Sequence, residues 1–305
     1  MSAKFIIGID LGGTNLKAGL LDKNYIMRDK IVLVTKKFVN KQGLISAIIF
    51  AIESLIKDNN LNKKQVLGVG IGVPGPVNYQ KGIVHFLPNI PGWREVKLKG
   101  ILEKKLELPV SIDNDAKAMT LAEYKFGNAR KFKNILCLTL GTGVGGGMII
   151  GGSLYRGKDN AAGEIGHLPI NEEGPRCNCG GIACLETYIG NAKILKLARA
   201  KFNKVISLEE LSRLASKGDK KSCAIWSSVG RHLGVALSGL VTVLNLDAII
   251  IGGGVAGAGK ILFDEVKDTI RKRSMSVQAA RVKILKAKLK NDAGIIGASI
   301  LVREG

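Results

Sequence analysis

The feature that most constrains the fold of this chain is a short motif that occurs twice. Residues 9–14 and 138–143 each contain the end of an apolar strand, a polar residue, Leu-Gly and a turn of small residues, and the two copies are offset by 129 positions. Repetition at this distance indicates two copies of one topology. Short apolar runs also alternate with longer segments of helical periodicity, which predicts an α/β chain with a duplicated core.

The same periodicity divides the rest of the chain into elements. Strands are predicted at residues 5–9, 17–21, 26–34, 66–73, 109–112, 134–140, 148–150, 248–251 and, as an edge strand, 282–289. Helices are predicted at residues 44–56, 113–126, 208–215, 222–245, 261–272 and 292–302. The first three strands are expected to form an antiparallel meander, and Asn114 to cap a helix. Residues 72–93, rich in Pro and Gly, predict a functional loop, and residues 157–190 an irregular segment.

The composition favours a folded protein with a solvated, Lys-rich surface. The 305 residues carry 46 Lys and Arg against 25 Asp and Glu, a formal net charge of +21, and 46% are hydrophobic. This apolar content excludes a disordered chain, and the length corresponds to about two domains. Because 34 of the basic residues are Lys and only 5% of all residues are aromatic, we expect no specific nucleic-acid partner.

The sequence also predicts a soluble, cytoplasmic protein without a membrane partner. The apolar run ahead of Asp10 is only five residues long, too short for a signal peptide. No run approaches the roughly 20 apolar residues of a membrane span, and the longest candidate, residues 248–258, is interrupted by four glycines.

The strongest chemical signal is a set of soft metal ligands. Three Cys and one His fall within 18 residues: His167, Cys177, Cys179 and Cys184. This set predicts a closed, structural zinc site, with buried free thiols as the alternative. Metal binding would order the loop that also carries Glu164 and Glu186. Cys137 and Cys223 lie in apolar segments and are predicted to belong to the core.

Glycine-rich turns follow three of the predicted strands, at residues 12–14, 141–143 with 145–147, and 252–254. Glycine allows backbone N–H groups to approach phosphate oxygens, so the three turns together predict two lobes that clamp a nucleotide, although each alone is typical of a tight turn. Asp10, at the end of the first strand, is a candidate ligand for Mg²⁺, with turn capping as the alternative. Asp113 and Asp115 flank Asn114 at a helix start, where they cap the helix or accept a proton from a substrate.

With these residues in view, the chain resembles the ROK family (repressors, open reading frames and sugar kinases) nearly end to end. The resemblance is carried by residues 7–15, 72–76, 114–116, 140–148, 163–167 and 177–186. It implies the two-lobed actin/Hsp70/sugar-kinase fold, which is ribonuclease H-like, with an interlobe cleft. The expected small lobe comprises residues 1–115 and 292–305, and the large lobe residues 116–291 with a zinc-binding loop at about 163–188.

The resemblance also implies the roles of individual residues. Asp115 corresponds to the catalytic base, and His167 is expected to serve both the zinc ion and the sugar. The implied sugar contacts are Gly75, Asn114, Asp115, Glu164, His167 and Glu186. The expected ATP and phosphate contacts are Asp10, Gly12, Gly13, Thr14, Asn15, Thr142, Gly143, Gly253 and Gly254. Three positions depart from the family pattern: Ala183 and Lys117 replace a usual Gly and a frequent Asn, and Gly190 stands where Ser is common.

The implied activity is that of an ATP-dependent hexose kinase with one structural Zn²⁺ per chain and Mg²⁺ bound with ATP. Glucose is the first expected substrate, because residues 84–93 resemble the glucokinase branch. N-acetylmannosamine, N-acetylglucosamine, mannose and fructose are the alternative substrates, and polyphosphate is an alternative donor. Closure of the lobes around the reactants and a homodimer are family expectations. A sugar-responsive repressor is less favoured, because no helix-turn-helix is seen ahead of the first strand.

Overall fold

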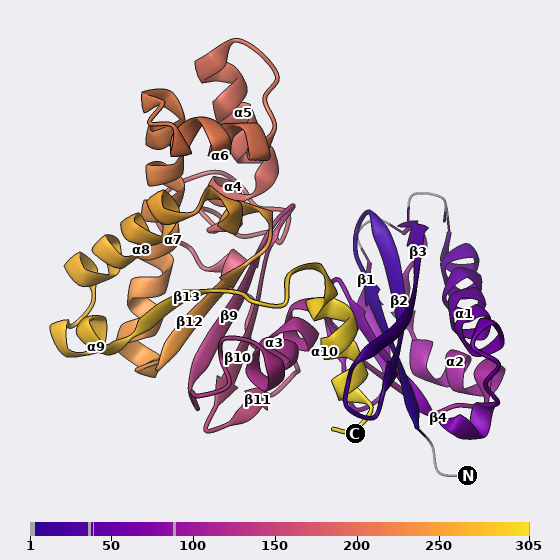
Figure 1. The fold of residues 1–305 in the computed structure, drawn as a ribbon. Coiled ribbons are helices and arrows are strands. Elements are labelled where there is room, and N and C mark those ends of the chain that lie inside the picture. Colours follow the sequence, from indigo (N-terminus) through magenta and orange to yellow (C-terminus); the bar gives the residue numbers. More distant parts are fainter. Residues whose placement is uncertain (1–3, 36–37, 39, 88–89, 305) are drawn as a thin grey trace. The chain divides into compact units, whose positions relative to one another are not determined.

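Two five-stranded β-sheets form the framework, one in each of the two units into which the chain divides (Figure 1). The computed structural model describes residues 4–35, 38, 40–87 and 90–304. The first unit comprises Met1–Phe126, Arg156–Ala162 and Asn291–Gly305, and the second comprises Gly127–Tyr155 and Gly163–Lys290. The boundary expected from the sequence lies at residue 115, whereas this division places the following helix in the first unit as well.

The two sheets have the same topology. The first has the order β3-β2-β1-β4-β8, formed by β1 (Phe5–Leu11), β2 (Asn15–Asp22), β3 (Met27–Val34), β4 (Val66–Val73) and β8 (Val110–Asn114). The second has the order β11-β10-β9-β12-β13, formed by β9 (Ile135–Leu140), β10 (Val144–Ile150), β11 (Ser153–Tyr155), β12 (Ala248–Gly252) and β13 (Lys283–Lys286). In each sheet three consecutive strands pair in antiparallel fashion. The two remaining strands run parallel to β1 in the first sheet and to β9 in the second. The predicted α/β fold with a duplicated core is therefore confirmed.

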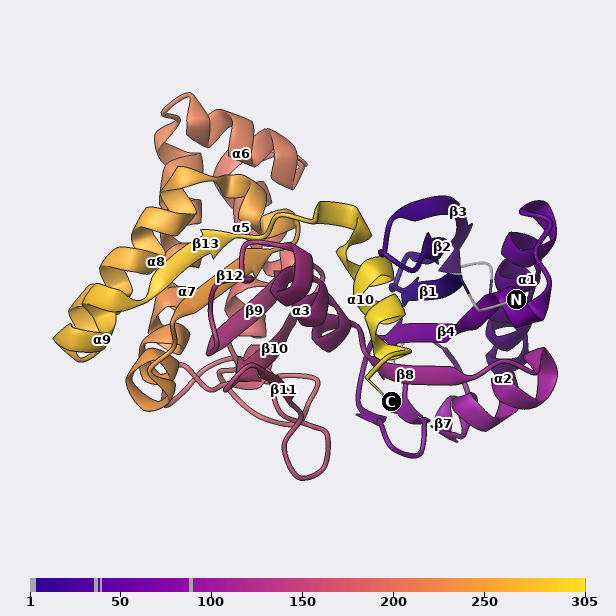
Figure 2. The ribbon, with the colours of Figure 1, turned by 60° about the horizontal axis from the view of Figure 1, so that its bottom comes forward.

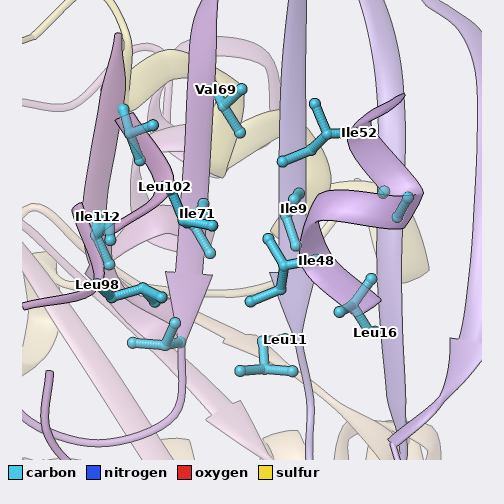
Figure 3. Close-up of a cluster of buried hydrophobic side chains, with 14 of the residues drawn as sticks. Ile9, Leu11, Leu16, Ile48, Ile52, Val69, Ile71, Leu98, Leu102 and Ile112 are labelled. Carbon is cyan, nitrogen blue, oxygen red and sulfur yellow. The ribbon is translucent and has the colours of Figure 1, made fainter. Parts of the chain in front are cut away.

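Helices α1 (Lys41–Asp58) and α2 (Leu98–Leu106) cover one face of the first sheet (Figure 3). Ile48 and Ile52 of α1, and Leu98 and Leu102 of α2, are buried at a spacing of four residues, which aligns each pair on one side of its helix. They lie over the buried residues Ile9, Leu11, Leu16, Ile71 and Ile112 of the sheet.

Helices α3 (Asp115–Phe126) and α10 (Ala293–Leu301) pack on the opposite face, where glycines replace side chains (Figure 2). Gly8 and Gly70 alternate with core residues along β1 and β4, and so they face away from α1. A Cβ atom at Gly8 would lie 2.1 Å from the carbonyl oxygen of Ile295, and one at Gly70 would lie 1.7 Å from that of Ala298. The backbone of α10 therefore lies directly on the two strands.

The helices of the second unit pack around α7 (Lys220–Leu244). Its neighbours are α4 (Glu186–Ile189), α5 (Asn191–Phe202), α6 (Leu208–Ser216), α8 (Lys260–Arg273) and α9 (Ser276–Arg281). Gly230 and Gly234 allow α8 to approach closely, since added Cβ atoms would meet Glu265 and Thr269 at 2.8 and 2.5 Å. By length and composition alone, α7 is apolar enough to cross a membrane. Its buried residues recur at helical spacing, which is typical of a core helix.

Several elements differ from the sequence-based prediction. Helices α2 and α5 were not predicted, because Lys and Arg residues interrupt their short apolar stripes. Helix α9 was not predicted either, because its six residues include no buried apolar stripe. The region predicted as one long loop, residues 72–93, contains β5 (Val77–Asn78) and β6 (Ile83–Phe86), which form a small sheet with β7 (Arg94–Val96) just after it. Residues 88–89 of this region lie outside the described chain. The glycines at residues 145–147, predicted as part of a turn, lie within β10. Strand β13 is at the sheet edge as predicted, but shorter.

We expect Gly70→Ala to destabilise the first unit by about 3 kcal/mol or more, because the new methyl group would overlap the backbone of α10. Gly100→Ala is the matched control. Gly100 lies in α2, and apart from the adjoining backbone of its own helix no described atom lies within 4 Å of the place that a methyl group would take there. The helix propensity of Ala should therefore stabilise the protein by up to about 1 kcal/mol. Urea unfolding measures both changes. Equal stability of Gly70→Ala and the parent protein would contradict the close approach of α10.

Candidate active site and metal centre

Three neighbouring parallel strands of the first sheet end at one edge and bring acidic residues there. Asp10 of β1 is in register with Gly72 of β4, and Gly72 is in register with Asp113 of β8. Helix α3 begins directly after β8, so Asn114 and Asp115 lie at the same edge. Ligands of open α/β sheets bind outside the carboxyl ends of the parallel strands.

Asn114 and Asp115 are held by the first turn of α3. The Oδ1 atom of Asn114 accepts hydrogen bonds from the backbone N–H groups of Ala116 (3.0 Å) and Lys117 (3.2 Å), as predicted for a helix cap. Its Nδ2 atom donates to the carbonyl oxygen of Gly75 at 3.2 Å. Asp115 accepts a hydrogen bond from the N–H of Ala116 at 2.8 Å. The carboxylate of Asp115 therefore lies at the positive end of a helix.

Two glycines make this arrangement possible. Gly75 has a φ of +106°, and a Cβ there would lie 2.7 Å from the carbonyl oxygen of Phe86. A Cβ at Gly72 would lie 3.3 Å from the Cα atom of Asp115. A side chain at Gly72 would push against Asp115 itself, and one at Gly75 would push against Phe86 and displace the carbonyl group that Asn114 binds.

Asp10 lies in a confined position beside α10. Its carboxylate receives a hydrogen bond from Lys17 at 3.4 Å, and a Cβ atom on Gly294 would lie 2.4 Å from Asp10 Cγ. Burial raises the pKa of Asp10, and the positive charge of Lys17 partly opposes this effect. Lys17 and Gly294 were not singled out from the sequence. The antiparallel register of β1 and β2 places Lys17 directly across from Asp10, and the sequence alone does not specify this register.

The first glycine turn connects β1 to β2 next to Asp10. The N–H of Gly12 donates to the carbonyl oxygen of Asn15 (2.8 Å), and the hydroxyl of Thr35 donates to the carbonyl oxygen of Gly12 (3.0 Å). Gly13 and Thr14 are exposed at the tip of the turn. Their backbone and hydroxyl groups are therefore accessible to a ligand.

The second glycine turn connects β9 to β10 and contacts Glu186. The N–H of Val144 donates to Oε2 of Glu186 at 2.8 Å, and a Cβ atom at Gly143 would lie 2.5 Å from the same oxygen. Gly143 thus leaves space for a carboxylate at the turn, while Thr142 is exposed beside it. Gly253, with a φ of +84°, lies against the end of β9, because its Cβ would lie 2.2 Å from the carbonyl oxygen of Leu140. Gly254 follows at the start of a 3-10 turn, Gly254–Ala258.

Gly146 of β10 allows another segment of the second unit to approach closely. A Cβ atom at Gly146 would lie 2.6 Å from the carbonyl oxygen of Gly163, and one at Gly166 would lie 2.3 Å from that of Val144. The segment that contains Glu164 therefore lies directly on the backbone of β10. The side chain of Glu164 is exposed, and His167 follows one turn later.

The predicted metal ligands come together in the second unit. One ligand atom from each of His167, Cys177, Cys179 and Cys184 lies within 4.8 Å of every other. The distances from Cys177 Sγ to His167 Nδ1 and from Cys179 Sγ to Cys184 Sγ are both 3.6 Å. Two thiolates bound tetrahedrally at about 2.3 Å from one ion would lie about 3.8 Å apart. The four residues therefore fit a single tetrahedral metal ion.

The pKa values of two of the thiols are shifted in opposite directions. Burial raises the pKa of Cys184 to about 12, whereas a hydrogen bond from the backbone of Gly181 lowers the pKa of Cys179. A bound cation would favour the thiolate form of both side chains. The loop is closed by a hydrogen bond from the N–H of Cys177 to the carbonyl oxygen of Gly181 at 2.8 Å.

Ala183 explains one departure from the family pattern. Its φ is +54°, in the left-handed region that favours glycine. A Cβ atom at Gly174 would meet the side chain of Ala183 at 2.9 Å, so the neighbouring chain also depends on a glycine. The position retains the backbone conformation of the usual Gly, and the methyl group adds strain of about 1–2 kcal/mol.

Comparisons with known proteins agree with this arrangement. The model of the ROK family matches residues 6–305. A glucokinase of Halalkalibacterium halodurans is 33% identical over 319 aligned positions, which cover 100% of this chain and 96% of the relative. The xylose repressor of Caldicellulosiruptor bescii is 31% identical, with 97% of this chain and 77% of the repressor covered. A ROK family glucokinase from Streptomyces griseus, solved with glucose and AMPPNP, has a TM-score of 0.85 at 31% identity, covering 99% and 100% of the two chains.

The chain is thus a two-lobed protein of the actin/Hsp70/sugar-kinase fold. It belongs to the ROK family.

The raised pKa of Asp10 predicts a stability effect with a definite sign. Because folding raises this pKa, ionisation of Asp10 opposes folding at pH 7, and the cost disappears as the pH falls below the ordinary Asp range. We expect Asp10→Asn to raise Tm at pH 7 by about 1–3 °C. The gain should shrink towards pH 4.

Asp22→Asn is a control of opposite sign. A backbone hydrogen bond from Ile26 lowers the pKa of Asp22, so ionised Asp22 stabilises the fold at pH 7. This substitution should lower Tm at pH 7, with a difference that fades on acidification. Thermal melts of the three proteins between pH 4 and 7 test both signs. A lower Tm for Asp10→Asn at pH 7 would contradict the dominance of burial.

Proposed function

We propose that this protein is an ATP-dependent hexose kinase that acts as a glucokinase, converting glucose and ATP into glucose 6-phosphate and ADP. The observation that carries the proposal is the position of Asp115, a carboxylate at the first turn of α3 beside the Asn114–Gly75 hydrogen bond. The similarity to glucokinases over the full length of both chains supports it.

In the proposed reaction, the 6-hydroxyl oxygen of glucose attacks the γ-phosphorus of ATP, and the bond to the ADP oxygen breaks. Asp115 accepts the proton that the hydroxyl loses. Positioning and charge stabilisation supply most of the catalysis in phosphoryl transfer. The exposed groups at Thr14 and Thr142 are the proposed phosphate contacts, with Asn15, Gly12, Gly13 and Gly143 beside them. Gly253 and Gly254 are the proposed contacts nearer the adenosine.

Asp10 is the proposed ligand of the Mg²⁺ ion that accompanies ATP, which would offset the negative charge of the phosphates. Magnesium is bound in proteins by one or two carboxylates together with substrate phosphates and water. The confined carboxylate of Asp10 lies next to the glycine turn and so fits this role.

We propose that the metal held by His167 and the three cysteines is a structural zinc ion. Because Nδ1 of His167 faces Cys177, the Nε2 atom stays available for a sugar hydroxyl. Gly75, Asn114, Glu164 and Glu186 are the other proposed sugar contacts. Their amide and carboxylate groups suit the hydroxyls of a hexose.

The choice of sugar and donor is open to a direct assay. A coupled assay with glucose, mannose, fructose, N-acetylglucosamine and N-acetylmannosamine, each with ATP and with polyphosphate, tests the proposal. We expect the highest kcat/KM with glucose and ATP. Turnover of an N-acetylated sugar alone would replace the proposed substrate. A cytoplasmic location and a homodimer also stay predictions, to be tested by fractionation and by light scattering.

We predict that Asp115→Asn lowers kcat for glucose by about 10²–10⁴-fold, the range expected when a general base is lost. Glucose binding by calorimetry and metal content should change little. Asp58→Asn, at the exposed end of α1, is the control and should retain full activity. Near-normal turnover by Asp115→Asn would refute the assignment of the base.

We predict about one zinc ion per chain by elemental analysis of the purified protein. Cys179→Ser should lower the zinc content and raise KM for glucose, because the loop with Glu164 and Glu186 would lose its cross-link. Cys223→Ser, outside the ligand set, should keep both at the parent values. A fully active protein without bound metal would refute the role of zinc.

A further inference from the structure

A short segment that leads to Glu164 is anchored beside the proposed catalytic base. Arg156–Ala162 belongs to the first unit, whereas the residues on either side of it in the chain belong to the second. We propose that Arg156 is a positioning residue, which holds the strand end before Asp115 and thereby sets the geometry of the base. This inference rests on the proposed kinase function and adds a residue to it.

The first contact of Arg156 is with a fully buried carboxylate. The Nε atom of Arg156 donates to Oδ2 of Asp113 at 2.8 Å, and Asp113 has 0% exposure. The other carboxylate oxygen, Oδ1, accepts a hydrogen bond from the N–H of Asn114 at 2.8 Å. Removal of one partner from a buried ion pair leaves an uncompensated charge. Asp113, and with it the backbone of Asn114, therefore depends on Arg156.

The guanidinium group of Arg156 is itself held from two further sides. It lies over the ring of Tyr79, with 3.9 Å from Cζ to the ring centroid. Its NH2 atom is 3.6 Å from Oε2 of Glu304. Aromatic stacking and a second carboxylate restrict the rotamers of Arg156. The guanidinium is thus a fixed support for Asp113.

A second contact anchors the segment Arg156–Ala162, and it involves a residue that follows Asp115 in the chain, whereas Asp113 precedes it. The Nζ atom of Lys117, a residue with 2% exposure, donates to the carbonyl oxygen of Asn160. The Nδ2 atom of Asn160 donates to Oε1 of Gln80 at 2.9 Å. Lys117 is one of the departures from the family pattern, and its length allows it to reach Asn160. In the chain, Asp115 therefore lies between Asp113 and Lys117, and both of these residues bind the segment Arg156–Ala162.

The anchored segment also leads directly to a residue that we propose to contact the sugar. Its last residue, Ala162, is followed by Gly163 and then by Glu164, a proposed sugar contact. A shift of about 1 Å in a reacting group can reduce the rate by about 100-fold. Loss of Arg156 should therefore act on the chemical step more than on the binding of ATP.

The test compares Arg156→Gln and Arg156→Lys in the full chain. We expect Arg156→Gln to lower kcat for glucose by about 10–100-fold while KM for ATP changes less than about twofold. Arg156→Lys keeps the positive charge and should recover part of kcat. Arg213→Gln, which removes an exposed ion pair with Glu210 on α6, is the control and should keep the parent kcat. An unchanged kcat in Arg156→Gln, or a loss seen only in KM for ATP, would overturn the inference.

Hydrogen exchange separates this inference from the proposed function. We expect faster exchange of the amides of residues 113–117 in Arg156→Gln, with unchanged exchange in α7 and α8. Absence of hexose phosphorylation by the parent protein would refute the kinase proposal, and the exchange at residues 113–117 would still report on the positioning role. If Arg156→Gln does not fold, Arg156→Lys and Glu304→Gln are compared in the same way, and parent-like exchange and kcat in both would overturn the inference.

Discussion

The register of three parallel strands is the constraint on which the candidate site depends. Asp10, Gly72 and Asp113 are aligned across β1, β4 and β8, so their backbones reach the same edge of the sheet. Gly72, the middle position, has no side chain, and this lets the start of α3 approach the sheet. A shift of one residue would turn every side chain of a strand to the other face. The buried apolar residues that alternate with the glycines prevent that shift, so the core fixes the positions of the carboxylates.

The second sheet uses the same framework for different chemistry. Thr139 of β9 is in register with Gly252 of β12, as Asp10 is with Gly72 in the first sheet. The copy therefore retains the glycine and replaces the carboxylate with a neutral hydroxyl. The carboxylates of the second unit come instead from outside the sheet: Glu186, the first residue of α4, contacts the turn after β9, and the segment with Glu164 lies over β10. Duplication thus accounts for the shared scaffold of the two units, whereas the positions of their carboxylates differ.

Most strands and helices could be predicted from the sequence. The structural roles of several individual residues could not. Strand β4 and the cap at Asn114 follow directly from apolar runs and helix-capping chemistry, which are local. The glycines of β10 resemble a turn in local sequence. Only the close contact with Gly163 explains why a glycine is needed in this strand, because the backbone of another segment lies directly on it. Arg156 had no signal in the sequence. Its partner Asp113 is 43 residues away, and an isolated Arg before a glycine is typical of an exposed loop.

Exposed and buried ion pairs of this chain differ in how much they contribute to stability. The chain has a net charge of +21, yet the exposed ion pairs, such as Arg213 with Glu210, contribute about 0–1 kcal/mol each. Breaking a buried pair by removing one partner costs about 3–5 kcal/mol. The Lys-rich surface therefore tolerates substitution, and the electrostatic constraint is concentrated at Asp113 and Arg156. Because Asp113 lies two residues before Asp115, a chain that must keep this buried pair also keeps the geometry of the proposed base.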